Sequence, residues 1–288
     1  LTYPPSVLPV EVPCLALVSP WLVLRAFDMG AQGFAVISDR GRCRAGLDSS
    51  RWREIIRFAQ GVLGCWGIES ERIRIFEAEE GAPHSIEPEL GRFAQEIATL
   101  GPTPLSTSEP APLPDKGLLL PALLKDIKNR LGSPTGEKVS AGAVPFGKIE
   151  LDSSQCTGCG LCSLECTTGA LIASPIEETG SFELLFKHDC CVACGQCVEI
   201  CPEKCLRLER VLELDSIDSP PVVLFADEIV RCRECGAPVA PRKMIDRLQA
   251  RLVRSGEQSA SQFELCPACK VSLSLGSAIP AHVTEAGR

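Results

Sequence analysis

Cysteine is the residue type whose number and spacing point most clearly to chemistry in this chain. The 288 residues include 17 cysteines, and 14 of them lie after residue 155. Many form Cys-x-x-Cys pairs, which favour metal or redox sites over disulfides in a cytosolic protein. The first residues, LTYPPSVLPVEV, have no charged segment followed by a long apolar one. We therefore expect no secretory signal and a cytoplasmic location.

Two cysteine-rich runs, CTGCGLCSLEC and CVACGQCVEICP, share spacings of two, two and three residues. They resemble the runs of bacterial ferredoxins, in which three cysteines of a run bind one [4Fe–4S] cluster and the fourth binds the other. The resemblance implies a ferredoxin-like α+β dicluster domain over residues 149–212. A zinc site is the alternative, but zinc takes one set of four ligands. The expected first-cluster ligands are Cys156, Cys159, Cys162 and Cys201, and those of the second are Cys191, Cys194, Cys197 and Cys166.

The runs depart from the ferredoxin pattern at a few positions. Thr167 stands where a proline usually follows the fourth cysteine of the first run. Cys190 precedes Cys191 and offers another register, but only Cys191 gives the spacing of two, two and three. We expect Cys190 and Cys205 to be small buried residues rather than ligands, and His188 to be structural.

Two further Cys-x-x-Cys pairs lie near the C-terminus, and four cysteines in this arrangement predict one tetrahedral metal site. The pairs are Cys232 with Cys235 and Cys266 with Cys269. Structural zinc in a zinc-ribbon-like domain over residues 225–275 is the preferred interpretation. Rubredoxin-type iron uses similar spacing but has an aromatic core, and Phe263 is the only aromatic residue between the pairs. A third cluster is the remaining alternative.

The elements before the cysteine-rich half alternate between strands and helices. The apolar spacing predicts strands over 9–18, 33–38 and 72–78 and helices over 20–30, 49–67 and 87–100. Ser19 and Pro20 fit the N-cap and first turn of a helix. This order predicts an α/β domain over residues 1–100, with a small parallel sheet and flanking helices. Residues 101–148 are expected to form a Pro/Gly-rich linker with a short helix over 118–131.

The segments VPCLALVSPWLVLRAFDMGAQGFAVIS and LGCWGIESERIRIFEAEEG resemble the delta subunit of methyl-viologen-reducing hydrogenase. The resemblance covers about residues 6–100 and implies a domain that docks onto heterodisulfide-reductase-type flavoproteins. It also implies a [2Fe–2S] cluster, of whose ligands only Cys14 and Cys43 match. Ser38 and Asp39 stand where a Cys-His pair would be, and Cys65 is additional. Two ligands do not hold the cluster, so we expect its loss unless a preceding segment or a neighbouring subunit supplies more.

The combination predicts an electron-transfer subunit with no catalytic site of its own. It would relay electrons between a heterodisulfide-reductase-like flavoprotein and a hydrogenase- or formate-dehydrogenase-like partner in a hetero-oligomer. The net charge of −8 argues against a nucleic-acid partner, and no apolar run is long enough to span a membrane. The alternatives are a self-contained oxidoreductase and an iron–sulfur or zinc sensor. Three acidic residues near the cysteines should lower the cluster potentials, namely Glu165, Glu199 and Glu203.

Overall fold

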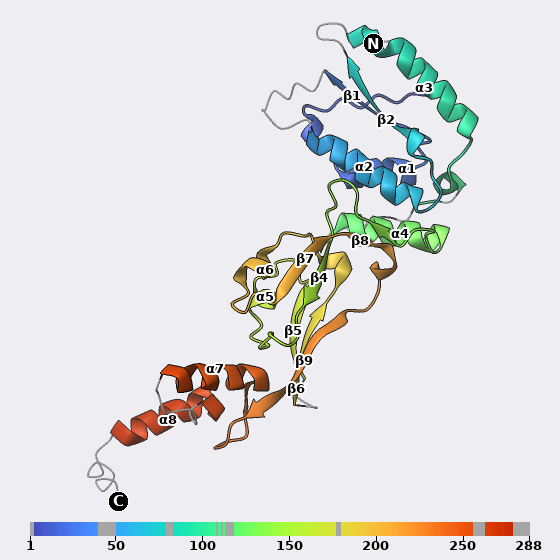
Figure 1. Cartoon of the computed structure of the whole chain (residues 1–288). Helices are drawn as coiled ribbons and strands as arrows, with labels where there is room; N and C mark the ends of the chain where they lie inside the picture. The colour runs from blue at the N-terminus through green and yellow to red at the C-terminus, as the bar shows by residue number, and fades with distance from the viewer. Residues whose placement is uncertain are drawn as a thin grey trace, which may run out of the picture. The chain divides into compact units, whose positions relative to one another are not determined.

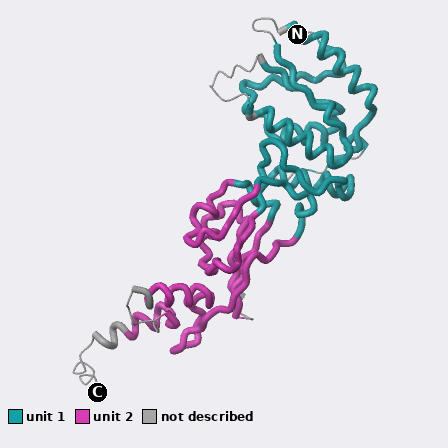
Figure 2. The backbone as a smooth tube through the Cα atoms, viewed as in Figure 1, with its two compact units in different colours: residues 1–148, 188–193, 210–219 teal, residues 149–187, 194–209, 220–288 magenta. Residues whose placement is uncertain are grey.

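The computed structural model describes residues 3–39, 50–78, 83–107, 109–110, 112, 118–176, 180–255 and 263–278. The chain divides into two compact units, which Figure 2 shows in different colours. The first unit comprises residues 1–148, 188–193 and 210–219, and the second comprises 149–187, 194–209 and 220–288. The first unit therefore takes residues 188–193 and 210–212 from the stretch that the sequence assigned to the ferredoxin domain. No helix among the described residues is both long and apolar enough to cross a membrane.

The first unit contains a two-stranded parallel sheet with helices on both faces (Figure 1). Strand β1 (Phe34–Asp39) pairs with β2 (Ile73–Ala78). Side chains alternate between the faces along each strand. One face packs into the core that contains α1 (Pro20–Asp28) and α2 (Ser50–Gly64), and the other packs against α3 (Glu87–Leu100). Cover on both faces is the usual arrangement of a parallel sheet.

The expected strand over residues 9–18 is replaced by a short 3₁₀ helix, η1 (Leu15–Leu17). Pro9 and Pro13 lack backbone N–H groups, which disfavours a ladder of strand hydrogen bonds in this stretch. Helix α1 begins as predicted, because the Ser19 side chain accepts a hydrogen bond from the Leu22 amide at 3.2 Å. The other short 3₁₀ helices of this part are η2 (Ser70–Arg72), η3 (Pro83–Ile86) and η4 (Pro104–Thr107).

The described residues of the 101–148 segment pack into the core of the first unit rather than forming a separate linker. Helix α4 (Leu119–Leu131) buries Leu123, Leu124 and Ile127 completely. Strand β3 (Lys138–Val139) pairs with β8 (Leu212–Glu213), which leads into η6 (Leu214–Ser216). Trp66 Nε1 donates to the Gly132 carbonyl at 3.1 Å. The proline-rich composition marked irregular backbone, but the apolar side chains within it still join the core.

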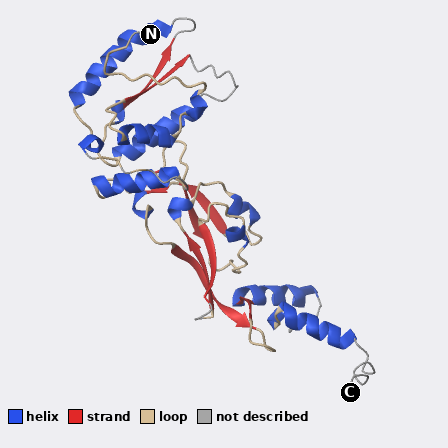
Figure 3. Ribbon diagram, turned by 180° about the vertical axis from the view of Figure 1, so that it is seen from behind, coloured by secondary structure: helices blue, strands red, loops and turns tan. Residues whose placement is uncertain are grey.

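The second unit contains a four-stranded antiparallel sheet in the order β10-β9-β6-β5, whose strands are red in Figure 3. Its strands are β5 (Leu171–Ile176), β6 (Ser181–Phe186), β9 (Val222–Arg231) and β10 (Pro238–Pro241). Strand β9 pairs with β6 on one side and with β10 on the other. The C-terminal part therefore continues the sheet of the ferredoxin-like part and does not form a detached ribbon.

The remaining elements are short pieces around the cysteine-rich runs and two C-terminal helices. Strands β4 (Gly147–Leu151) and β7 (Leu206–Arg210) pair with each other. Helices α5 (Leu161–Leu164) and α6 (Gln196–Ile200) pack against each other, and η5 (His188–Cys190) precedes the second run. The C-terminal helices are α7 (Arg242–Ser255) and α8 (Pro267–Ala278).

Candidate metal centres

Four of the predicted cluster ligands line one cavity in the second unit. Three belong to the first cysteine run, and the fourth, Cys201, comes from the end of the second run. Thr157 and Glu203 are the polar residues of the lining; the other members are cysteine, glycine, proline and apolar side chains. Leu151, Phe182, Leu184 and Leu206 supply apolar wall. Residues from two distant runs thus meet around a mostly apolar cavity.

The electrostatics of this cavity favour a positively charged occupant. Burial, with smaller contributions from the nearby Cys159 and Cys156, raises the pKa of the Cys162 thiol to about 12. Burial also raises the pKa of Cys156, although the Gly158 amide donates to its Sγ at 3.4 Å and opposes this shift. Thiolates in such a place need a metal centre to balance their charge. The donor set and the apolar walls therefore fit an iron–sulfur cluster.

The loops of the two runs have positive φ values at the same two positions. In the first run, Gly158 and Gly160 have positive φ values of 68° and 75°. Ala193 and Gly195, at the same positions of the second run, have values of 52° and 82°. A non-glycine residue seldom adopts positive φ, so its occurrence at Ala193 indicates that the loop requires this conformation. The match holds when the second run is counted from Cys191, which favours this register over one that starts at Cys190.

The predicted ligands of the second cluster lie on the loops and helices next to these turns. Cys166 follows α5, and its Sγ accepts from the Leu171 amide at 3.4 Å. The Cys191 amide donates to the His188 carbonyl at 3.0 Å. Cys194 is exposed and Cys197 lies in the first turn of α6. Their assignment as one ligand set depends on the spacing and on the shared loop conformation.

Cys205 is a residue whose place by the cavity the sequence analysis missed. It is buried, lines the cavity, and its Sγ lies 3.5 Å from Cys201 Sγ. Burial raises its pKa, and the hydrogen bond with Cys201 adds to this effect. Its position four residues after Cys201 was the available signal, because the strand that follows returns along the cavity wall. His188 has a structural setting: its Nε2 accepts from the Glu213 amide at 3.0 Å, and its ring stacks on Phe146.

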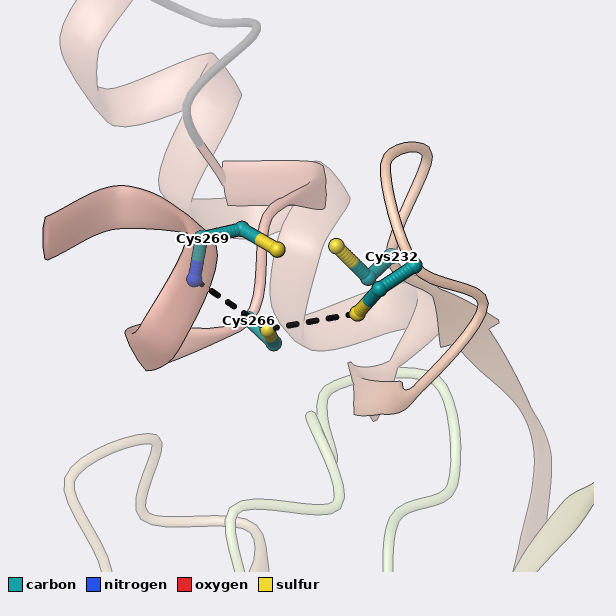
Figure 4. A group of neighbouring side chains, drawn as sticks. Cys232, Cys266 and Cys269 are labelled. Atoms are coloured by element: carbon teal, nitrogen blue, oxygen red, sulfur yellow. Dashed lines mark hydrogen bonds between the residues drawn. The ribbon is translucent and has the colours of Figure 1, made fainter. Parts of the chain in front are cut away.

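The four C-terminal cysteines, which the sequence groups into one candidate site, lie close together. The Sγ atoms of Cys232, Cys235, Cys266 and Cys269 all lie within 4.8 Å of one another. Figure 4 shows the Cys269 amide, which donates to Cys266 Sγ at 3.5 Å. Among the residues that the structure describes, no other group of three or more potential ligands is so tight. This spacing suits a single tetrahedral ion, whereas the wider cysteine set around the cavity suits a larger group.

Backbone hydrogen bonds shape the two turns around this site. The Cys232 amide donates to the Ala237 carbonyl at 2.7 Å, and the Gly236 amide donates to the Cys232 carbonyl at 2.8 Å. Gly236 takes a φ of 74°, which a glycine adopts without strain. Backbone donation from Cys266 lowers the pKa of Cys232 to about 6, so this thiol ionises readily. A thiolate among three close sulfurs is the donor chemistry that binds zinc.

The cysteines linked to a [2Fe–2S] cluster by resemblance occupy separate settings. Cys14 is the N-cap of η1, and its Sγ accepts from the Ala16 amide at 3.4 Å. Cys43 lies outside the described residues. Cys65 is buried near the end of α2, donates to the Gly61 carbonyl at 3.3 Å, and has a pKa raised by burial. The described residues therefore assemble no ligand set for this cluster.

Comparison with known proteins gives a family match for the N-terminal domain and for the part that holds the two cysteine-rich runs. Residues 1–101 match the family described as methyl-viologen-reducing hydrogenase, delta subunit, and residues 155–206 match the 4Fe-4S dicluster domain. The chain carries a domain of the hydrogenase delta-subunit family and an iron–sulfur dicluster domain. Both predicted resemblances are confirmed, and with them the iron–sulfur character of the protein. The four C-terminal cysteines lie outside both matched ranges.

Similar proteins come from species of Methanocaldococcus, Methanococcus and Methanothermobacter. The chain is 28% identical over 106 residues to an iron–sulfur subunit of the vhu F420-non-reducing hydrogenase from Methanocaldococcus jannaschii, covering 36% of this chain and 79% of the relative. It is 29% identical over 108 residues to the corresponding protein of the vhc hydrogenase from Methanococcus voltae, covering 36% and 74%. It is also 33% identical over 79 residues to the polyferredoxin protein MvhB of Methanothermobacter marburgensis, covering 24% and 19%. The likeness to each relative is thus limited to one part of this chain.

Proposed function

We propose that this chain is an electron-transfer subunit that relays single electrons through two [4Fe–4S] clusters within a multisubunit redox complex. The observation that carries the proposal is the mostly apolar cavity lined by Cys156, Cys159 and Cys162 together with Cys201. A ligand from the far end of the second run is the signature of crossed ligation in two-cluster ferredoxins. When bound, the clusters supply reversible one-electron chemistry, and the apolar walls of the cavity shield the first cluster from water.

The two ligand sets are proposed to be crossed. Cys201 completes the first cluster, and Cys166 completes the second with Cys191, Cys194 and Cys197. The cavity supports the first set, and the equal loop conformations of the two runs support the second. Gly158 and Gly160 bring the backbone close to the cavity, where amide N–H groups can donate to sulfur. Such donation stabilises the reduced state of a cluster.

The C-terminal cysteines are proposed to hold one structural zinc ion. The support is the tight tetrad of sulfurs and the scarcity of apolar side chains around it. Zinc has no redox chemistry, so this site would stabilise the fold and leave electron transfer to the two clusters. The N-terminal domain of the delta-subunit family is proposed to dock the chain onto its partners rather than to carry a [2Fe–2S] cluster.

The proposed partners are a heterodisulfide-reductase-like flavoprotein and a hydrogenase- or formate-dehydrogenase-like subunit. The match of residues 1–101 to the delta-subunit family and the names of two relatives, which are hydrogenase iron–sulfur subunits, support the hydrogenase-like partner. The other partners are proposed from the resemblance alone. The proposed location is the cytoplasm. Purification of the native complex, followed by identification of its other subunits, tests the partners directly.

The cluster content is tested on the chain after anaerobic reconstitution. Two cubanes predict about eight iron atoms and about eight acid-labile sulfides per chain. Reduction by dithionite should give electron paramagnetic resonance signals of two interacting [4Fe–4S]⁺ centres. An iron content near four, with the signal of one isolated centre, would refute the two-cluster assignment.

A further inference from the structure

We propose that the C-terminal four-cysteine module sets the redox potential of the first cluster through two arginines that pair with Glu203. The module comprises β9, β10, α7 and the four C-terminal cysteines. The inference rests on the proposed function, because it requires the first cluster in its cavity and a metal ion at the C-terminal cysteines. The module would then control the redox potential of the relay in addition to stabilising the fold.

Glu203 is the acidic residue of the first-cluster cavity. It follows the proposed ligand Cys201 by two positions and belongs to the cavity lining. Its side chain is only 8% exposed, yet it has two cationic partners. Arg247 Nη2 donates to Glu203 Oε2 at 2.7 Å, and Arg251 Nη2 donates to Oε1 at 2.8 Å. Each carboxylate oxygen is thus paired with its own guanidinium.

The two arginines reach this carboxylate because of their spacing on α7. Residues four apart lie on the same face of a helix, so Arg247 and Arg251 present their side chains together. The N-terminal end of α7 is also fixed, because the Lys243 amide donates to Asp227 at 2.8 Å and Lys243 Nζ donates to the Ser153 carbonyl at 2.9 Å. The helix is therefore held both on the sheet and on the loop that leads into the first run.

The chain connectivity links this helix to the metal site. Helix α7 lies in sequence between Cys235 and Cys266, one from each pair of the tetrad. An ion that joins the pairs closes the segment that contains α7 into a loop and restricts where the helix can go. Loss of the ion would leave the C-terminal end of α7 without this restraint. Occupancy of the tetrad thereby becomes coupled to the pairing of Glu203.

The sheet that carries α7 also contacts the loop of the first run. A Cβ on Gly158 would lie 3.0 Å from Phe225 Cε1 and 3.0 Å from Pro241 Cγ. Phe225 belongs to β9 and Pro241 is the last residue of β10, immediately before α7. The module therefore packs against the residue between two proposed cluster ligands. The module thus contacts two residues that line the same cavity, Gly158 and Glu203.

The sign of the effect follows from charge. A buried carboxylate beside a cluster disfavours the added electron and lowers the potential, whereas a nearby cation raises it. The arginine side chains are 45% and 53% exposed, so water screens them more than it screens Glu203. Removing the arginines should leave the carboxylate uncompensated and make the first potential more negative. Removing the carboxylate should make that potential more positive.

The test uses the full chain, reconstituted with iron and sulfide and loaded with zinc. Redox titration followed by electron paramagnetic resonance gives the potential of each cluster. We expect a negative shift of the first potential in R247Q/R251Q, a positive shift in E203Q, and a return toward the original value in R247K/R251K. The matched control is R242Q, since Arg242 is on the same helix but pairs with Glu228 at 2.9 Å and with Glu264 at 3.8 Å, both outside the cavity lining. It should leave both potentials unchanged.

Removal of the zinc by a chelator tests the coupling in the same preparation. We expect the first potential to shift in the direction of R247Q/R251Q, with the second cluster as internal reference. Equal shifts in E203Q and R247Q/R251Q, or no shift in either, would overturn the inference. If the Glu203 and arginine variants retain two clusters and one zinc but their potentials are unchanged, this inference alone is wrong. A chain that binds no first cluster overturns the proposed relay as well.

Discussion

Removal of the proposed C-terminal metal ion should unfold the two cysteine turns and free the C-terminal end of α7, while strands β5, β6 and β9 stay folded. The buried cluster at this site consists of Cys232, Leu265 and Cys266, with Ala237, Val239 and Cys269 packed against it. Leu265 is its one large apolar side chain, and full burial of such a side chain contributes about 1.5–3 kcal/mol. Ordering the backbone costs about 1–2 kcal/mol for each residue. This apolar contribution offsets the ordering of roughly two residues.

The proposed metal ion would therefore supply the dominant stabilising free energy in this part of the chain. Structural zinc supplies an apparent free energy of about 10–16 kcal/mol in isolated zinc-finger peptides. That amount exceeds the apolar contribution of Leu265 several-fold. The strands β5, β6 and β9 do not depend on it, because they pair with one another and contribute Leu184 and Phe225 to buried positions. Unfolding should therefore stop short of the main sheet.

Hydrogen exchange on the chelated chain measures this directly. The amides of Cys232, Gly236 and Lys270 are hydrogen-bonded within the turns and should lose their protection. Amides in the β5–β6 pairing should keep theirs, and the iron content should stay the same. Metal loss with unchanged protection of the turns would refute the reasoning. A visible charge-transfer band and a redox response at this site would instead identify iron, which would be a third redox centre in the relay.

Three further outcomes are expected. Crossed ligation predicts that the double variant C201S/C205A loses the first cluster and keeps the second; Cys205 is included because its sulfur lies 3.5 Å from that of Cys201, and C205A alone is the matched control. Loss confined to the second cluster would contradict crossing. C190A should keep about eight iron atoms per chain, and a lower count would mean that the register starts at Cys190. Burial lowers the pKa of His188 below the ordinary value of about 6.5, so the unfolded chain takes up a proton first as the pH falls. The stability that neutral His188 contributes should be complete above a pH of about 6.5 and decline below it. The melting temperature of H188Q should therefore depend less on pH than that of the unaltered chain.

Local sequence signals predicted the elements of the first unit well. Ser19 and Pro20 predicted the start of α1, and the apolar spacing predicted α2, α3, β1 and β2 to within a few residues. These features depend on capping and periodicity, which neighbouring residues determine. The predicted first strand failed for a local reason too, because two prolines remove donors from it.

Long-range packing was not accessible from the sequence. Leu105 is fully buried although it lies in a proline- and serine-rich stretch, and Gly142 lies so close to α2 that a Cβ there would be 2.2 Å from the Glu54 carbonyl oxygen. Composition reports the conformational freedom of a segment but not its tertiary contacts. Strand β9 similarly serves two partners at once, which no local pattern indicates. The cysteine spacings were more informative, because the geometry of their metal centres restricts them strongly.

The acidic residues near the cysteines show how burial separates positions that look equivalent in sequence. Glu165, Glu199 and Glu203 all lie within two residues of a proposed ligand. Glu165 and Glu199 are exposed, so water and salt screen their effect on a cluster. Glu203 lines the cavity with a side chain that is 8% exposed and bound by two arginines. A buried carboxylate acts strongly on its neighbours and is costly without partners, so of these three residues we expect Glu203 to have the greatest influence on the potential and to depend most on α7.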